Sequence, residues 1–368
     1  MRAGRIIRAY ETAPVFCPIL PPLASGQELT PFSASKKARE FGLIKHVIGN
    51  LTLRSSIGNQ SSMTLRFSER LAEAVTRLGN GVVVGLDPRR EQIPTSLRRG
   101  HGDAPIERAR IYSAFCCGVI DVVAPLVPAV KPQAAFFEEL GPAGMQALSE
   151  VILHAYSRDV IVILDGKRND IGSTAEAYAR GYLGRGQTEC GADALTVSPY
   201  LGADSIEPFV KTAHERRAGV FVLVKTSNPG GGQFQDLVCD GKPVYRHVAE
   251  FVERLAATSV GKSGYGDVGA VVGATWPEQL VELRQAMPHA WLLIPGYGSQ
   301  GGKASDVAAA FDSRGLGALV NNSRGIIFAH SRPEYAGRFK PGQWQQAVES
   351  ATRDMIAELR DAQRSLNG

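Results

Sequence analysis

The sequence predicts a (β/α)8 barrel, and three observations support this fold class. From residue 63 onward, short apolar runs alternate with longer amphipathic stretches. The apolar runs are rich in β-branched residues and almost uninterrupted, which is typical of parallel strands buried on both faces. Glycine-rich turns follow the last two runs, whereas the first run, GVVVGLD, lacks the GxGxxG fingerprint of an open doubly wound sheet. The barrel is therefore preferred to the doubly wound alternative.

Eight apolar runs are expected to form the strands. Residues 63–81 come first and have the composition of an opening helix. Helix-like segments with apolar residues at helical spacing lie between the runs, and residues 106–123 and 204–218 are two of them. Eight such repeats in roughly 300 residues fit a TIM barrel. The runs span residues 81–87, 123–131, 160–167, 193–200, 219–227, 269–275, 291–298 and 317–323.

The first 62 residues differ from the rest in charge and proline content. They hold 8 of the 41 Lys and Arg residues and 3 of the 36 Asp and Glu residues, so residues 63–368 carry 33 of each. Four prolines between residues 14 and 22 interrupt any signal-peptide helix. We expect residues 1–62 to be a disordered extension, or to precede a natural start at Met63, with a transit peptide as the alternative. Residues 63–368 are expected to form one barrel domain.

The composition argues against several classes of protein. The neutral balance of residues 63–368 gives no basic face for nucleic acid. The five cysteines include no CxxC pair, which argues against a disulfide framework and fits a reducing cytoplasm. The seven histidines show no metal-binding spacing, and no apolar run reaches the ~18 residues of a membrane span. We therefore expect a cytoplasmic protein that binds no nucleic acid, membrane or metal.

Charged residues follow the first three predicted strands, where the active sites of TIM barrels lie. They are Asp87, Lys131, Asp165, Lys167 and Asp170, and Lys225 ends the fifth predicted strand at the same rim. Alternation along a strand would place Asp165 and Lys167 on the same side, in the barrel mouth. Opposite charges this close keep each other ionised, so a lysine there could donate a proton. The alternative is a ring of ion pairs that only stabilises the barrel, although buried pairs are weak stabilisers.

The turns after the last two strands predict a phosphate site. GYGSQGG (296–302) and NNSRG (321–325) occupy the usual phosphate-binding position of TIM barrels. Their glycines expose backbone N–H groups to an anion, and Arg324 offers a guanidinium fork. A third glycine run, 228–233, is expected to form a mobile loop over the mouth. The residues alone thus predict a barrel enzyme for a phosphorylated small molecule, with proton-transfer or carbanion chemistry, a lysine acid and no metal.

Over residues 66–330, the sequence resembles the orotidine 5′-phosphate decarboxylases. DGKRNDIGST (165–174) matches the D-x-K-x-x-D-I-x-x-T signature of that family, and the likeness is greatest to its longer bacterial branch, type 2. The resemblance implies a TIM barrel of the ribulose-phosphate-binding type. It also implies cofactor-free decarboxylation of orotidine 5′-monophosphate to uridine 5′-monophosphate, the last step of de novo pyrimidine nucleotide biosynthesis. Six further blocks stand in the family's order, namely GLDPR (85–89), VKPQAAFFE (130–138), VSPYLG (197–202), VKTSNPG (224–230), PGYGSQGG (295–302) and NNSRGIIFA (321–329).

The resemblance implies roles for the residues of the charge cluster. Lys167 resembles the lysine that protonates C6 of the pyrimidine, and Asp165 resembles the carboxylate beside the substrate carboxylate. Lys131 and Asp87 resemble the members of the charge network that bind the ribose. One departure is Tyr297, which is bulkier than the residue usual in the glycine turn of the family.

Other residues are implied to complete the substrate site. Asp170 and Thr174 resemble residues that reach the neighbouring subunit's site, which implies a homodimer. Ser227 resembles the serine that contacts the pyrimidine edge. Gln300 and Arg324 resemble the residues that grip the phosphate.

Three alternatives stay open. Sister barrels that share the DxKxxD stretch act on sugar phosphates with magnesium held by extra carboxylates, and the Ser227 block and Gln300 argue against them. A Schiff-base aldolase would use Lys167 or Lys225. A non-catalytic nucleotide-binding barrel would use Arg324 and the glycine turns but would not require the charge cluster.

Overall fold

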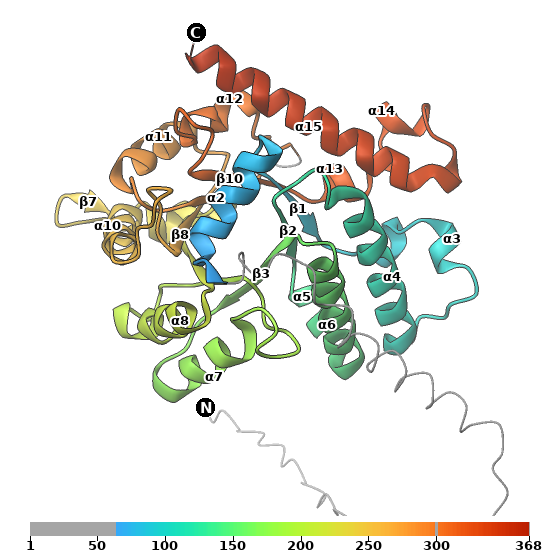
Figure 1. Cartoon of the computed structure of the whole chain (residues 1–368), viewed down its shortest axis with the longest axis horizontal. Coiled ribbons are helices and arrows are strands. Elements are labelled where there is room, and N and C mark those ends of the chain that lie inside the picture. The colour runs from blue at the N-terminus through green and yellow to red at the C-terminus, as the bar shows by residue number, and fades with distance from the viewer. Residues whose placement is uncertain (1–63, 299–300, 368) are drawn as a thin grey trace, which may run out of the picture. The chain divides into compact units, whose positions relative to one another are not determined.

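Eight parallel strands close into a barrel in the computed structural model, which describes residues 64–298 and 301–367 (Figure 1). The expected extension, 1–62, and Gln300 lie outside these residues. Around the barrel the strands follow one another in chain order, which confirms the (β/α)8 prediction. The barrel strands are β1 (Val82–Leu86), β2 (Ala129–Pro132), β3 (Ile161–Arg168), β4 (Ala194–Val197), β5 (Gly219–Lys225), β8 (Val268–Val272), β9 (Leu292–Ile294) and β10 (Ala318–Asn322).

Helices lie outside the barrel and connect consecutive strands, as parallel pairing requires. The helix-like segments predicted at 106–123 and 204–218 correspond to α4 (Pro105–Val123) and α8 (Ala203–Arg216). A short antiparallel pair, β6 (Val238–Cys239) and β7 (Lys242–Pro243), follows β5. The helices are α2 (Phe67–Leu78), α3 (Thr95–Arg98), α4 (Pro105–Val123), α5 (Ala135–Glu138), α6 (Gly141–Ser157), α7 (Gly172–Tyr182), α8 (Ala203–Arg216), α9 (Gly232–Gln235), α10 (Val244–Ala257), α11 (Pro277–Ala286), α12 (Ala304–Val307), α13 (Arg324–Ile327), α14 (Pro333–Ala336) and α15 (Trp344–Asn367).

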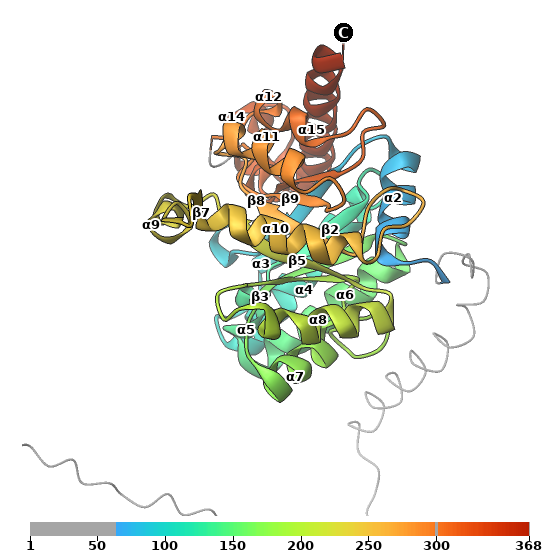
Figure 2. The same cartoon turned by 90° about the vertical axis from the view of Figure 1, so that its left-hand side faces the viewer.

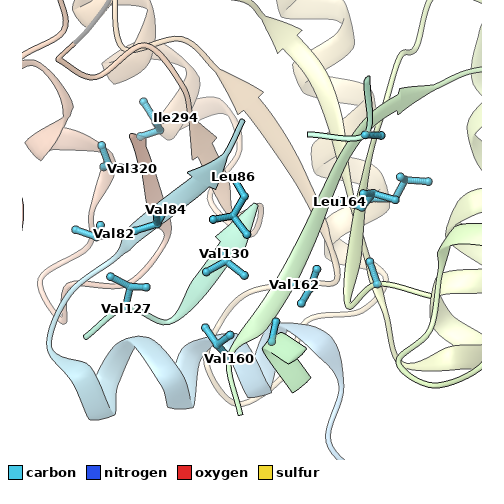
Figure 3. Packing of buried hydrophobic residues seen from close by; sticks show 14 of the residues in the cluster. Val82, Val84, Leu86, Val127, Val130, Val160, Val162, Leu164, Ile294 and Val320 are labelled. Atoms are coloured by element: carbon cyan, nitrogen blue, oxygen red, sulfur yellow. The ribbon is translucent and has the colours of Figure 1, made fainter. Parts of the chain in front are cut away.

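The strands bury side chains on both faces, which is why their sequences are almost uninterrupted apolar runs. On the outer face, Val82, Val84 and Leu86 of β1 join a large cluster between the strands and the helices (Figure 3). On the inner face, Val83 and Leu319 belong to a second cluster that fills the barrel.

Helix α2 contributes to the inner cluster and lies across the amino-terminal end of the strands. Its Phe67 ring occupies the space that a Cβ on Gly219 would need, at 2.2 Å from the nearest ring atom. Two buried carboxylates hold the helix there. The backbone N–H of Ser68 donates to Asp267 at 2.8 Å, and Arg70 forms a 2.5 Å ion pair with Asp193.

A polar layer lies above the inner apolar cluster, at the carboxyl end of the strands. Strand alternation places Asn321 on the same face of β10 as Leu319, two residues earlier. Lys131 on β2, Asp165 on β3 and Thr196 on β4 lie on the barrel wall at the same end. The barrel therefore changes from an apolar interior to a polar mouth.

Candidate active site

The polar layer opens into a cavity of about 600 Å³ at the carboxyl end of the barrel. Most of the residues predicted for the site line this cavity. They are Asp87, Lys131, Asp165, Lys167, Ser227 and Arg324.

Asp165 is the centre of the charge network. Its Oδ2 accepts hydrogen bonds from Lys131 Nζ at 2.6 Å and Gln133 Nε2 at 3.1 Å. Its Oδ1 accepts from Lys167 Nζ at 2.5 Å and Thr196 Oγ1 at 3.0 Å. Each carboxylate oxygen thus accepts two hydrogen bonds, and together these bonds fix the orientation of the Asp165 side chain. Two lysines that would otherwise repel each other are held at one wall of the cavity.

The charges of this network stabilise one another. Burial would raise the pKa of Asp165, but the Lys131 and Lys167 ammonium groups outweigh it and hold the pKa well below its usual range. Burial would lower the pKa of Lys131, yet the carboxylates of Asp165 and Asp87 raise it above its ordinary value. Asp165 and Lys131 are therefore ionised across the neutral pH range.

Lys167 reaches Asp165 by a different route from the alternation that the sequence suggested. The pairing of β3 with β4 shifts between Leu164 and Arg168, so this end of β3 bulges. The backbone of Lys167 has a φ of 44°, in the left-handed region that residues other than glycine rarely adopt. Its backbone N–H is held by Thr196 Oγ1 at 2.9 Å. The bulge turns the lysine toward the cavity, and its side chain keeps 47% of its surface exposed.

The opposite wall of the cavity is apolar. It consists of Leu223, Val271, Leu293 and Pro295, which come from β5, β8 and the end of β9. A flat ring could pack there while its polar edges and substituents face the charged wall. This division suits a ligand with one apolar face and several polar groups.

The end of β5 presents Ser227 to the cavity through a tightly held backbone. Gln235 Oε1 accepts the N–H of Thr226 at 3.0 Å, and Gln235 Nε2 donates to Thr226 Oγ1 at 2.8 Å. The indole of Trp276 donates to the carbonyl of Thr226 at 3.0 Å. The glycine run 228–233, expected to be a mobile loop, forms two short helical turns that lead to Gln235 (Figure 2).

Lys225 does not join the charged residues at the mouth, although it was counted among them as the residue ending strand five. Its side chain is buried and forms an ion pair with Asp236. Its ammonium lies 4.8 Å from the ring centroid of Trp276 and 5.3 Å from that of Tyr245. The pairing of β5 with β8 shifts between Leu223 and Lys225, and this irregularity changes the face to which the lysine belongs.

The glycine turn after β9 contributes Gly296 and Tyr297 to the cavity wall. Gly296 and Gly298 have φ values of 96° and 69°, which glycine adopts without strain. The hydroxyl of Tyr297 donates a hydrogen bond to Glu358 of α15. Burial and this carboxylate raise the pKa of Tyr297 well above its ordinary value, so the hydroxyl keeps its proton.

Arg324 lies at the start of α13, directly after β10. The turn there is organised by Asn322, whose Oδ1 accepts the N–H of Gly325 at 3.2 Å. Helix α15 packs against both α12 and α13, which follow the two glycine turns (Figure 1). One helix therefore supports both turns of the predicted phosphate end.

Asp170 and Thr174 lie apart from the other predicted residues. Neither is among the described residues that line the cavity of their own chain. Asp170 accepts the N–H of Ile171 at 2.8 Å, and Thr174 is exposed on α7.

Several cavity residues were missed by the sequence argument. Gln133 and Thr196 both bond Asp165, and strand alternation from Lys131 could have indicated Gln133. Gln235 and Asn321 also line the cavity. Gln235 had no local signal, because it reaches the site only through the fold of the segment after β5.

No group of three or more His, Cys, Asp or Glu side chains in residues 64–298 and 301–367 is arranged to hold a metal ion. Within the same residues, no helix is long and apolar enough to cross a membrane.

The fold and the site define a TIM-barrel enzyme with a lysine–carboxylate centre at the carboxyl end of its strands. Comparison with known proteins gives the family. The model of the Orotidine 5′-phosphate decarboxylase / HUMPS family matches residues 81–339. The chain belongs to this family.

Individual relatives agree with this result. The chain is 57% identical over 300 residues to an orotidine 5′-phosphate decarboxylase of Rhodopirellula baltica, covering 80% of this chain and 99% of the relative. It is 40% identical over 276 residues to one of Caldicellulosiruptor bescii, covering 72% and 90%. Among solved structures, the Leishmania donovani OMP decarboxylase superposes with a TM-score of 0.63 at 32% identity, covering 81% of this chain and 99% of that chain.

Proposed function

We propose that the chain decarboxylates orotidine 5′-monophosphate to uridine 5′-monophosphate, the last step of de novo pyrimidine nucleotide biosynthesis. The observation that carries the proposal is the Lys131–Asp165–Lys167 network on one wall of the cavity, opposite an apolar wall. The relatives named orotidine 5′-phosphate decarboxylase support the choice of substrate. The cytoplasmic location expected from the sequence is part of the proposal.

The substrate would lie across the cavity with its phosphate at the end of β9 and β10. Arg324 and the backbone of the glycine turn after β9 would bind the phosphate, with Gln300 from the same turn. Asp87 and Lys131 would bind the ribose. The pyrimidine would pack on the apolar wall, with Ser227 at its polar edge.

The reaction would then take place beside Lys167. The substrate carboxylate would lie near Asp165, and cleavage of the bond to C6 would release carbon dioxide and leave the electron pair on C6. The Lys167 ammonium would stabilise this carbanion and transfer a proton to C6, becoming a neutral amine that regains a proton from solvent. The fixed Asp165 holds Lys167 Nζ in place before the reaction, so little reorganisation is required. We propose that no cofactor takes part.

The proposal includes a homodimer in which Asp170 and Thr174 complete the site of the partner. Their position outside the cavity of their own chain supports this, because a role at the site then requires a second subunit. Exposed apolar side chains lie just before the neighbouring helices α7 and α8. Ile171 is 55% exposed and Tyr200 is 83% exposed, as suits residues that a partner would cover.

Substitution of Lys167 tests the assignment of the proton donor. Lys167→Ala should lower kcat by at least about 1,000-fold, because the proton and the positive charge at C6 are lost together. Affinity for uridine 5′-monophosphate should change less than about tenfold, since the phosphate and ribose contacts remain. The matched control is Lys262→Ala, which removes an exposed lysine between α10 and β8 and should leave both quantities unchanged. Retention of turnover by Lys167→Ala would refute the assignment.

A further inference from the structure

Two buried oxygen atoms at the junction of β1 and β10 accept no hydrogen bond from any part of the chain that the structure describes. They are Oδ1 of Asp87 and Oδ1 of Asn321, and both residues line the cavity. Strand β1 pairs with β10, so the two residues come from neighbouring strands. A buried acceptor without a partner is costly, and such atoms often mark the place where a ligand binds. The charge network around Asp165 does not use Asn321.

Asn321 faces the cavity because of its place on β10. It follows Leu319 of the inner cluster by two residues, so it shares the inner face of the strand. The neighbouring strand gives it space, since a Cβ on Gly85 would lie 3.2 Å from Asn321 Oδ1 and 1.9 Å from Ser323 Oγ. Asn321 is only 7% exposed, so its amide has a fixed environment.

Asn322 provides a natural contrast. It is also 7% exposed, but it lies on the other face of β10. Its Oδ1 accepts the N–H of Gly325, so its role is to shape the turn before α13. Of two adjacent asparagines with equal burial, one has a structural partner and the other faces the cavity.

The chemistry of the amide indicates what would bind it. Asn321 lies three residues before Arg324 and beside β1, which Asp87 directly follows, between the proposed phosphate and ribose positions. A side-chain amide has both a donor and an acceptor, and so has a hydroxyl group. A sugar hydroxyl can therefore pair with the amide in either of its orientations, whereas a phosphate oxygen can only accept.

We propose that Asn321 binds a ribose hydroxyl of the nucleotide, together with Asp87, and that it makes the site selective for ribonucleotides over a deoxynucleotide. The inference rests on the proposed function, because it places a nucleotide in the cavity. Asn321 acts as a specificity-determining residue for the sugar and takes no part in proton transfer.

The test measures binding of uridine 5′-monophosphate and its 2′-deoxy and 3′-deoxy analogues by calorimetry, with Asn321→Leu and Asn321→Ala. Each variant should bind uridine 5′-monophosphate about 3- to 10-fold more weakly than the unchanged protein, the range for one hydrogen bond. One of the two deoxy analogues lacks the hydroxyl that pairs with Asn321. The variants and the unchanged protein should bind this analogue with equal affinity. The variants should also bind uridine, which lacks the phosphate, more weakly than the unchanged protein does.

Asn322→Leu is the matched control. It should affect the ribonucleotide and both deoxy analogues by the same factor, since it acts through the turn. A loss in the Asn321 variants that is equal for all three nucleotides would overturn the inference, and so would a loss that disappears with uridine, which would indicate a phosphate contact. Turnover of orotidine 5′-monophosphate by the unchanged protein is measured alongside, so a failure of the proposed function is seen separately.

Discussion

Replacement of Lys131 by methionine should destabilise the protein, because it leaves Asp165 as a buried charge with one ammonium partner fewer. The side chains of Lys131 and Asp165 are 5% and 10% exposed, and their charged atoms are 2.6 Å apart. Breaking such a pair from one side typically costs about 3–5 kcal/mol. Asp165 keeps its contacts with Gln133, Lys167 and Thr196. We therefore expect a cost at the lower end of this range, about 3 kcal/mol.

The assay is urea unfolding followed by tryptophan fluorescence, with the free energy of unfolding obtained by linear extrapolation. A double-mutant cycle with Asp165→Leu isolates the pair. The double variant Lys131→Met/Asp165→Leu should lose less free energy of unfolding than the two single variants lose in sum. The reason is that it leaves no buried charge without a partner. Arg353→Met, which removes an exposed ion pair with Glu349 on α15, should cost less than about 1 kcal/mol.

The pH dependence gives a second signature of the same pair. Asp165 has a lowered pKa in the folded protein, so its contribution to stability is present above the unfolded pKa and is lost as the pH falls through the folded pKa. Lys131→Met should raise the folded pKa and thereby reduce that contribution. A single substitution that costs less than about 1 kcal/mol, or additive losses in the cycle, would refute the reasoning.

Three other experiments test the rest of the site. Tyr297→Phe removes the hydrogen bond between the glycine turn and α15, so KM for orotidine 5′-monophosphate should rise about 3- to 10-fold with kcat little changed, as steady-state kinetics would show. Gly85→Ala places a Cβ 1.9 Å from Ser323 Oγ and should lower kcat/KM at least about tenfold by displacing the cavity wall; full activity would contradict the packing. Inactive Lys167→Ala and Asp170→Ala chains should regain activity when mixed and allowed to exchange subunits, and an absence of rescue between chains shown to exchange would count against a shared site.

The sequence predicted the barrel well, because burial on both faces leaves a strong local signal. Each of the eight apolar runs overlaps a barrel strand, and the charged residues that end β2 and β3 meet at Asp165 as expected. The failure at Lys225 and the unpredicted backbone conformation at Lys167 both occur where a strand is irregular. The shift between β5 and β8 removes Lys225 from the mouth, and the bulge in β3 brings Lys167 to Asp165 with a φ of 44°. Neither irregularity leaves a residue pattern that period-two alternation can detect.

The contacts made by the segment after β5 were also not predicted from the sequence. Its glycine run suggested a loop, yet the segment returns Gln235 to Thr226 and Asp236 to Lys225. These contacts join residues 9 and 11 positions apart across a turn. Local propensity does not determine such a return, because it depends on packing against the barrel.

The ultraviolet absorbance of orotidine 5′-monophosphate, followed with the purified protein in the presence and absence of EDTA, tests the central claim most directly. Loss of the substrate band at the same rate in both would establish a metal-independent decarboxylase, which is the predicted result. An unchanged band in both, or activity that EDTA abolishes and magnesium restores, would contradict the account.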